Sequence, residues 1–232
     1  MTPSFASTQA TTPSCPLCGG PPPVPLVEAH GRRYLECRDC GLALVAPGDL
    51  PTAGEERARY DTHRNDPGDP GYRAFLARLA DPLQEVLAPG ARGLDYGSGP
   101  GPTLSVMMAE RGFSMEIWDP FYAPDPAPLA RTWDFVTCTE TAEHFHCPGA
   151  EFDRLGRLLG PGGTLALMTS WWSPPPGATR EERARHLARW HYIRDPTHVA
   201  LYRRSTLDRV ARDRGWDVRH PRRNVSLFRI PG

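Results

Sequence analysis

The chain has 232 residues, enough for one catalytic domain with a small addition, and its 27 basic and 27 acidic side chains leave no net charge. Neutrality disfavours broad electrostatic capture of nucleic acid or of an anionic membrane surface. No apolar run reaches the ~20 residues of a membrane span. Residues 1–14 are polar and lack the apolar centre of a secretory signal, so we expect a disordered tail there and a cytoplasmic protein.

Four of the six cysteines form two Cys-x-x-Cys pairs, Cys15 with Cys18 and Cys37 with Cys40. The 18 residues between the pairs (19–36) fit the spacing of a four-thiolate zinc site. A glycine follows each pair and lets the backbone amides turn toward the thiolates. Because four protein ligands close the coordination sphere, we predict a structural zinc ion in a zinc ribbon at 15–48, followed by a linker at 49–71.

Hydrophobic periodicity predicts the elements of the remaining chain. Apolar residues at helical spacing indicate a helix over 72–87. Strands are predicted at 92–97, 114–119, 133–138, 164–170, 216–221 and 224–230, and helices at 102–112, 150–163 and 205–215. Strands that alternate with helices predict an α/β, Rossmann-like, doubly wound and mostly parallel sheet, and the last two strands would add an antiparallel C-terminal edge. The segment between 119 and 133 shows no clear strand–helix unit.

A glycine-rich turn, LDYGSGPGP, lies between the strand at 92–97 and the helix after it. Glycines at 97, 99 and 101 allow the sharp turn and close backbone approach that a bound ligand needs. Asp119 ends the next strand, 24 residues after Asp95, where a carboxylate can accept hydrogen bonds from ribose hydroxyls. The pattern predicts a site for a nucleotide-like cofactor, although the spacing differs from the dinucleotide pattern G-x-G-x-x-G.

A second polar segment, TCTETAEHFHCPG, follows the strand at 133–138. Its Glu140, Glu143 and His144 stand at i, i+3 and i+4 and would share one face of a helix. Ligands of open α/β sheets bind at the carboxyl ends of the strands, so we expect these side chains at the mouth of the site. Carboxylate and imidazole groups suit Mg, Mn, Co or Zn. The later segment WHYIRDPTH offers further candidate ligands in His191, Asp195 and His198.

From about Tyr72 to its C-terminus the chain resembles the class I S-adenosylmethionine-dependent methyltransferases. The segments that carry the resemblance are LDYGSGPG, WDP, FVTCTETAEHF and LLGPGGTLALMTS. The resemblance implies a methyltransferase domain at 72–232 with a seven-stranded sheet and a lid insertion at about 171–197. It also implies that S-adenosylmethionine is the cofactor, with its methionine part along Gly97, Gly99 and Gly101, its ribose at Asp119, and Asp95 shaping the loop.

The run ETAEH further resembles the E-x-x-E-H run of ubiquinone-pathway O-methyltransferases and of small-RNA 2′-O-methyltransferases. Those families carry a later His before an aromatic residue and a helix, as THVALYRRSTL does here. The resemblance implies that Glu140, Glu143, His144 and His198 hold a divalent ion such as Mg or Mn, which would orient a substrate hydroxyl and lower its pKa. Without an ion, His144 or His191 is the candidate general base, so the candidate catalytic residues are His144, His191 and Glu140.

We therefore expect a methyltransferase that acts on a small-molecule acceptor, at oxygen, and not on nucleic acid or at a membrane. An RNA methyltransferase remains an alternative, with Arg32, Arg33, Arg38 and Tyr34 of the ribbon as a docking patch, although no extended basic stripe supports it. A sugar C-methyltransferase is another alternative, because some of these enzymes also join a zinc-bearing N-terminal part to this fold. A third is a non-catalytic protein that keeps the cofactor fold. The sequence predicts neither the acceptor nor the oligomeric state.

Overall fold

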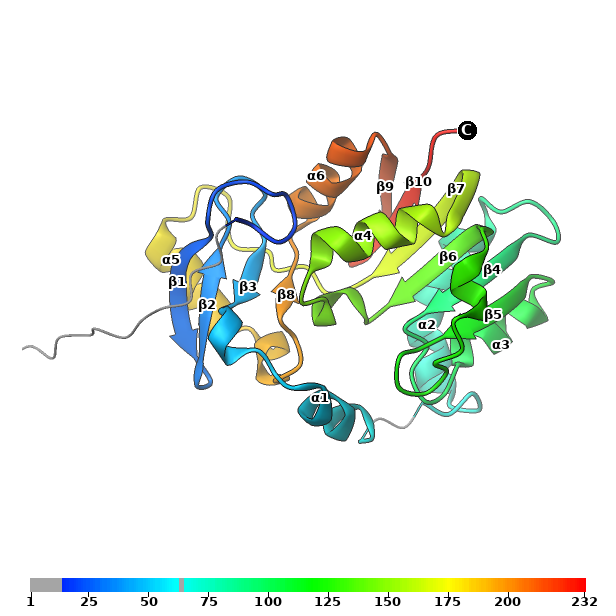
Figure 1. Ribbon diagram of the computed structural model, residues 1–232, viewed down its shortest axis with the longest axis horizontal. Helices are drawn as coiled ribbons and strands as arrows, with labels where there is room; N and C mark the ends of the chain where they lie inside the picture. Colours follow the sequence, from blue (N-terminus) through cyan, green and yellow to red (C-terminus); the bar gives the residue numbers. More distant parts are fainter. Residues whose placement is uncertain (1–13, 63–64) are drawn as a thin grey trace, which may run out of the picture.

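The computed structural model describes residues 14–62 and 65–232, so the expected tail lies, apart from Ser14, outside the described residues. Two sheets lie along the long axis of the molecule (Figure 1). The smaller sheet comprises, in spatial order, β1 (Val24–Ala29), β2 (Arg32–Glu36), β3 (Ala43–Val45) and β8 (Ala200–Leu201). Its neighbouring strands all pair antiparallel.

The larger sheet carries the cofactor motif. It comprises, in spatial order, β5 (Ser114–Trp118), β4 (Arg92–Tyr96), β6 (Trp133–Thr139), β7 (Leu159–Met168), β10 (Val225–Arg229) and β9 (Asp217–Arg222). The first four of these run parallel, whereas β10 pairs antiparallel with both β7 and β9. This arrangement confirms the predicted Rossmann-like, doubly wound and mostly parallel sheet with an antiparallel C-terminal edge.

The expected number of strands was wrong, because the larger sheet has six strands in the described residues and not seven. The segment 120–132, between β5 and β6, forms only an isolated bridge from Asp119 to Ala123 and a short 3-10 helix, Ala127–Ala130. Prolines stand at positions 120, 124, 126 and 128 of this segment. Proline has no backbone N–H to donate to a strand ladder, so β5 stays at the edge of the sheet.

Helices cover both faces of the larger sheet (Figure 1). On one face lie α4 (Pro148–Arg157) and α6 (Arg204–Arg214), and on the other α2 (Pro70–Gln84) and α3 (Thr103–Glu110). Successive strand residues point to opposite faces. Val136 and Leu165 accordingly belong to the core beneath α4, while Phe135 and Ala166 belong to the core beneath α2.

The boundaries of two elements differ from expectation around the glycine-rich stretch LGPGG. The helix expected at 150–163 is α4, which ends at Arg157, and the stretch itself opens β7 at Leu159. Glycine and proline are the poorest helix formers, so the helix stops before them. The helix expected at 72–87 is α2, whose buried Leu76, Leu79 and Leu83 lie at helical spacing as predicted.

The zinc-ribbon region packs directly against the segment expected to form a lid. Strand β8 follows that segment and pairs with β3, with Ala43 opposite Leu201. Helix α5 (Arg180–Arg189) belongs to the segment and packs against β1. The fully buried Trp172 shares one core with Tyr34 of the ribbon. Helix α1 (Ala53–Tyr60) connects this part with the larger sheet (Figure 1).

None of the helices in the described ranges is both long enough and apolar enough to cross a membrane.

Candidate functional site

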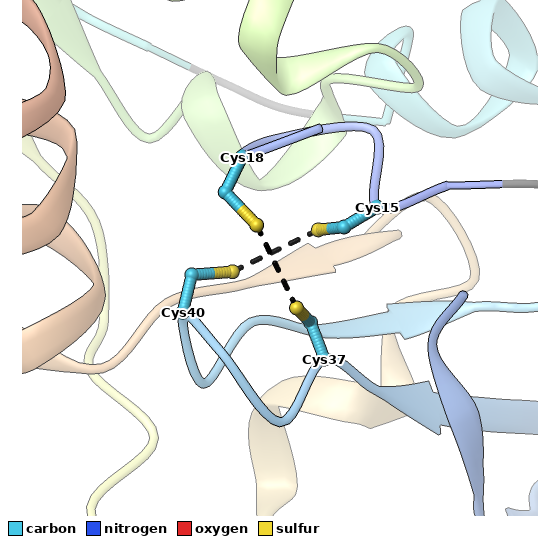
Figure 2. A group of neighbouring side chains, drawn as sticks. All are labelled: Cys15, Cys18, Cys37 and Cys40. Carbon is cyan, nitrogen blue, oxygen red and sulfur yellow. Dashed lines mark hydrogen bonds between the residues drawn. The ribbon is translucent and has the colours of Figure 1, made fainter. Parts of the chain in front are cut away.

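The four predicted zinc ligands converge at the edge of the smaller sheet. The Sγ atoms of Cys15 and Cys40 lie 3.7 Å apart, as do those of Cys18 and Cys37, and all four lie within 4.8 Å of one another. Figure 2 shows the sulfur atoms pointing toward a common centre. Tetrahedral zinc with Zn–S bonds of about 2.3 Å would hold its sulfurs about 3.8 Å apart. The side chains present therefore fit a structural zinc ion.

The two cysteine pairs stand in matching turns. The N–H of Gly19 donates to the carbonyl of Cys15, and that of Gly41 to the carbonyl of Cys37, both at 2.9 Å. Gly19 and Gly41 have φ values of +67° and +74°, in the left-handed region that favours glycine. The hydrogen bond with Cys40 lowers the pKa of Cys15 to about 5, whereas burial raises the pKa of Cys37 to about 11. The four sulfur atoms thus lie together in a mostly buried cluster, an arrangement that a cation would stabilise.

The glycine loop connects β4 to α3 and lies beside Asp119. Gly97 and Gly99 have φ values of +79° and +66°. The buried carboxylate of Asp119 accepts the N–H of Gly99 at 2.9 Å and the N–H of Phe121 at 2.8 Å. Asp95 accepts the Thr137 hydroxyl at 2.6 Å, and burial raises the pKa of Asp95 to about 6. The turn at Gly97 and Gly99 is therefore connected to Asp119, and a glycine turn at this place fits the close approach of a nucleotide-like ligand.

A cavity of about 860 Å³ opens at the carboxyl ends of β4, β5 and β6. This is the edge at which open α/β sheets bind ligands, and the volume is within the usual range for such sites. Its walls include residues 97–100, Asp119, Glu140, Glu143, His144, His198 and the aromatic side chains of Tyr60, Tyr72 and Phe75. The cofactor loop and the candidate metal ligands therefore face the same space.

The segment ETAEH does not form the helix that the spacing suggested. The N–H of Glu140 donates to the carbonyl of Met168 at 2.8 Å, after which the chain reverses with Glu140 at φ +47°. Only a short 3-10 helix, Ala142–His144, follows before α4. Glu140, Glu143 and His144 therefore do not share a helical face. Instead, the ligand atoms of Glu143, His144 and His198 lie within 4.8 Å of one another, and Glu140 stands beside this group.

Both histidines of the group are oriented by backbone carbonyls. His144 Nδ1 lies 2.9 Å from the carbonyl of Thr197, and His198 Nδ1 lies 2.7 Å from that of Tyr192. A carbonyl only accepts, so each Nδ1 carries a hydrogen, and in the neutral form of either ring the lone pair is on Nε2. Burial lowers the pKa of His198, which favours the neutral ring. Histidines that ligate a metal usually donate their other N–H in this way.

The carboxyl groups of Glu143 and Glu140 lie side by side, the first fully buried and the second partly exposed. Glu143 is 0% exposed and accepts hydrogen bonds from the hydroxyls of Thr169, at 2.8 Å, and Tyr192. The Tyr192 hydroxyl also lies 3.2 Å from Glu140. Burial and the charge of Glu143 raise the pKa of Glu140 to about 9. A buried charge is costly unless it is paired, so a cation beside Glu143 would offset the cost of burying the carboxylate charge.

Neither Thr169 nor Tyr192 was singled out from the sequence as a site residue. Their hydroxyls reach Glu143 from β7's end and from the short 3-10 helix His191–Arg194, so only the folded chain brings them together. His191 is exposed and does not line the cavity. His146 is exposed, and its Nε2 lies 2.9 Å from the Glu56 carboxylate. Of the two candidate bases, the structure therefore brings only His144 to the cavity.

Comparison with known proteins identifies the family. A model of the family described as "Methyltransferase domain" matches residues 63–220, more than half of the chain. The chain belongs to the S-adenosylmethionine-dependent methyltransferases. This methyltransferase is 30% identical over 173 residues to the ubiquinone biosynthesis O-methyltransferase of Xanthomonas campestris pv. campestris (strain B100), covering 60% of the chain and 71% of the relative. The family, its cofactor and its transferase activity are thus as predicted.

The solved structures show the same fold. An O-methyltransferase family protein from Burkholderia thailandensis superposes with a TM-score of 0.50 at 18% identity, covering 79% of this chain and 65% of that protein. The family model begins at residue 63, so the four zinc-ribbon cysteines lie outside the matched range.

Replacing Gly97 with Ala is expected to weaken binding of S-adenosylmethionine by about 10-fold or more, because the loop must shift. A Cβ at Gly97 would lie 2.3 Å from Cγ2 of Thr141. The Kd measured by calorimetry checks this. The matched control is Gly112→Ala, which has a similar φ of +86° but no atom within 4 Å of the new Cβ. Equal weakening in both variants would contradict the explanation.

Proposed function

We propose that this methyltransferase methylates an oxygen of an uncharged small molecule, with the help of a divalent ion held by Glu143, His144 and His198. The observation that carries the proposal is the pair of imidazoles, each with Nδ1 on a carbonyl and Nε2 available, beside a buried carboxylate on the wall of the cofactor cavity. The named activity of the Xanthomonas campestris relative is O-methylation, which supports the same chemistry.

Each residue has a definable role in this proposal. S-adenosylmethionine supplies a methyl group on a positively charged sulfur. A divalent ion at the cluster would lower the pKa of an acceptor hydroxyl. Tyr192 and Thr169 hold the carboxylate of Glu143 in one orientation through their hydroxyls. In the absence of an ion, the Nε2 lone pair of His144 is the base that would accept the proton of the hydroxyl.

The charges that line the cavity favour an uncharged acceptor. Among the described residues, six acidic side chains line it and the only basic one besides histidine is Arg154, which donates to the Tyr96 hydroxyl at 3.2 Å. The acids are Glu56, Asp119, Glu140, Glu143, Glu151 and Asp195. A phosphate-bearing acceptor, including RNA or a nucleotide-linked sugar, would be repelled, whereas the cationic cofactor would be attracted. Aromatic walls favour a flat, apolar acceptor.

Methyl transfer to a fractionated metabolite extract tests the proposal. The protein is dialysed free of loosely bound divalent ions, its zinc content is confirmed, and S-adenosylmethionine with a labelled methyl group is supplied with or without Mg²⁺ or Mn²⁺. We expect the label on an oxygen of an uncharged small molecule, and only with an added ion. Label on RNA, on carbon or on a phosphorylated compound would contradict the acceptor assignment. Full activity without an added ion would contradict the metal site and leave His144 as the base.

A further inference from the structure

We propose that Arg32 of the zinc ribbon is a positioning residue for the active site, because it holds the loop 192–198 that orients both histidines of the cluster. The zinc ribbon then has a role in catalysis beyond its own stability. The catalytic consequence rests on the proposed function, whereas the effect on the loop does not.

The two terminal nitrogens of the Arg32 guanidinium donate four hydrogen bonds to the backbone of a single loop. Arg32 is only 9% exposed, and among the described residues no carboxylate forms an ion pair with it. Its nitrogens donate to the carbonyls of Ile193 at 2.6 Å, Pro196 at 2.7 Å, Asp195 at 3.0 Å and His198 at 3.3 Å. A planar group with five N–H donors can satisfy several acceptors in fixed directions, which a lysine cannot do.

The loop needs such a donor because it has little regular structure. Its 3-10 helix ends at Arg194, and the next strand, β8, begins only at Ala200. Buried carbonyls without a hydrogen bond are costly, so donors from outside must fix the course of the chain. Arg32 supplies those donors from β2, a strand more than 160 residues away in the sequence.

The same loop orients the two imidazoles. His144 Nδ1 donates to the carbonyl of Thr197, and His198 Nδ1 to that of Tyr192. The carbonyls that bind the histidines belong to the same short segment as those that Arg32 binds. A shift of the loop would therefore turn both rings away from Glu143. Displacement of a reacting group by about 1 Å can lower a rate by about 100-fold, so even a small shift would be costly.

A second path connects the ribbon to Glu143. The N–H of Val45, at the end of β3, donates to the carbonyl of Val199 at 2.9 Å. The N–H of Val199 in turn donates to the carbonyl of Glu143 at 2.8 Å. Cys37 and Cys40 lie in the turn between β2 and β3, so a zinc ion at the four cysteines would hold together the hairpin that bears both Arg32 and Val45. Because Arg32 is buried on the loop, it is not available for the RNA-docking patch considered from the sequence.

The test compares Arg32→Ala with Arg33→Ala. Arg33 is the matched control, since it lies in the same strand but binds Asp49 of the ribbon at 2.7 and 2.8 Å. For Arg32→Ala we expect faster hydrogen exchange confined to residues 191–199, with zinc content and the Kd for S-adenosylmethionine unchanged. With an identified acceptor, kcat should fall by about 100-fold and KM for the cofactor should stay constant. Arg33→Ala should match the wild type in all of these.

Chemical rescue separates positioning from a general loss of structure. Guanidinium ion at low, non-denaturing concentration should restore part of the kcat of Arg32→Ala and slow exchange in the loop, with no such effect on Arg33→Ala. If Arg32→Ala does not fold, the same measurements are made on Arg32→Lys. This variant keeps the positive charge but cannot reach all the carbonyls. Unchanged loop exchange and kcat in the tested variant would overturn the proposal, as would zinc loss that parallels the loss of activity. If the wild type transfers no methyl group to a small molecule, the proposed function fails, while loop exchange still tests Arg32.

Discussion

Replacing Cys40 with Ser is expected to release the zinc ion and abolish methyl transfer. A hydroxyl is a poor substitute for a thiolate, and three thiolates no longer close a tetrahedral site. In zinc-finger peptides the binding of structural zinc is worth about 10–16 kcal/mol of folding free energy, as much as the whole stability of an ordinary domain. Elemental analysis for zinc, thermal unfolding and the methyl-transfer assay measure the effect.

Loss of zinc should destabilise more than the ribbon, because the ribbon contacts other parts of the fold. The first cysteine turn packs on the start of α4, where the N–H of Gly149 donates to the carbonyl of Pro16 at 2.9 Å. The second turn leads into β3, which pairs with β8. Tyr34 and Trp172 are buried in a core that both parts share. We therefore expect Tm to fall by about 10 °C or more, as a loss of several kcal/mol implies for a chain of this size.

A cysteine outside the cluster is the control for this substitution. Cys147→Ser changes an exposed thiol that is not part of the group of four, and it should keep the zinc content and Tm of the wild type. A Cys40→Ser protein that retains one zinc ion and a normal Tm would contradict the assignment of the site. A normal Tm combined with zinc loss would show that the ribbon does not support the rest of the fold.

The parts of the site that could be predicted are those written in short stretches of sequence. The cysteine pairs can be recognised from their spacing, because each pair forms one local turn. The glycine loop and Asp119 could be found because a strand precedes each of them, and parallel strands end at the same edge of a sheet. His198 was found through its resemblance to a family pattern, although it is 54 residues from His144 (198 − 144).

The parts that could not be predicted depend on contacts between distant segments. Nothing in the spacing of ETAEH shows that Glu140 adopts φ +47°, which removes it from the helical face assumed for it. The hydroxyl of Thr169 and the guanidinium of Arg32 act on the site only because β7 ends and β2 begins near it. Arg32 also shows how composition can mislead. An arginine near a tyrosine suggests a surface patch, but the side chain of Arg32 is buried.

Replacing Glu143 with Gln is expected to lower kcat by about 100-fold or more, because the amide has no charge to hold a divalent ion beside the two imidazoles. The shape of the side chain is kept, so the fold should survive. Glu56→Gln is the matched control, since Glu56 lines the same cavity but binds the exposed His146. Activity close to the wild type in Glu143→Gln, or an equal loss in Glu56→Gln, would contradict the assigned cluster.

The same substitution should change how stability depends on pH. The pKa of Glu140 rises from its ordinary 4.5 to about 9 in the fold, through burial first and the charge of Glu143 second. Between these pH values the folded state binds more protons than the unfolded state, so the free energy of unfolding falls as pH rises. Because Glu143→Gln removes the second cause, its stability should fall less between about pH 6 and pH 9.

A bound divalent ion should have the opposite effect on how stability depends on pH. This effect distinguishes a metal site from a histidine base that works without metal. A divalent cation beside Glu143 would favour the ionised form of Glu140, so Mg²⁺ should raise Tm more near about pH 9 than near about pH 6. At about 100 times Kd the ion would add about 2.7 kcal/mol, or about 5–10 °C in Tm. Glu143→Gln should lose this response at both pH values. If Mg²⁺ leaves Tm of the wild type unchanged across this range, the carboxyl pair holds no ion. The hydrogen bonds from Tyr192 and Thr169 then serve only to keep Glu143 buried beside a histidine base.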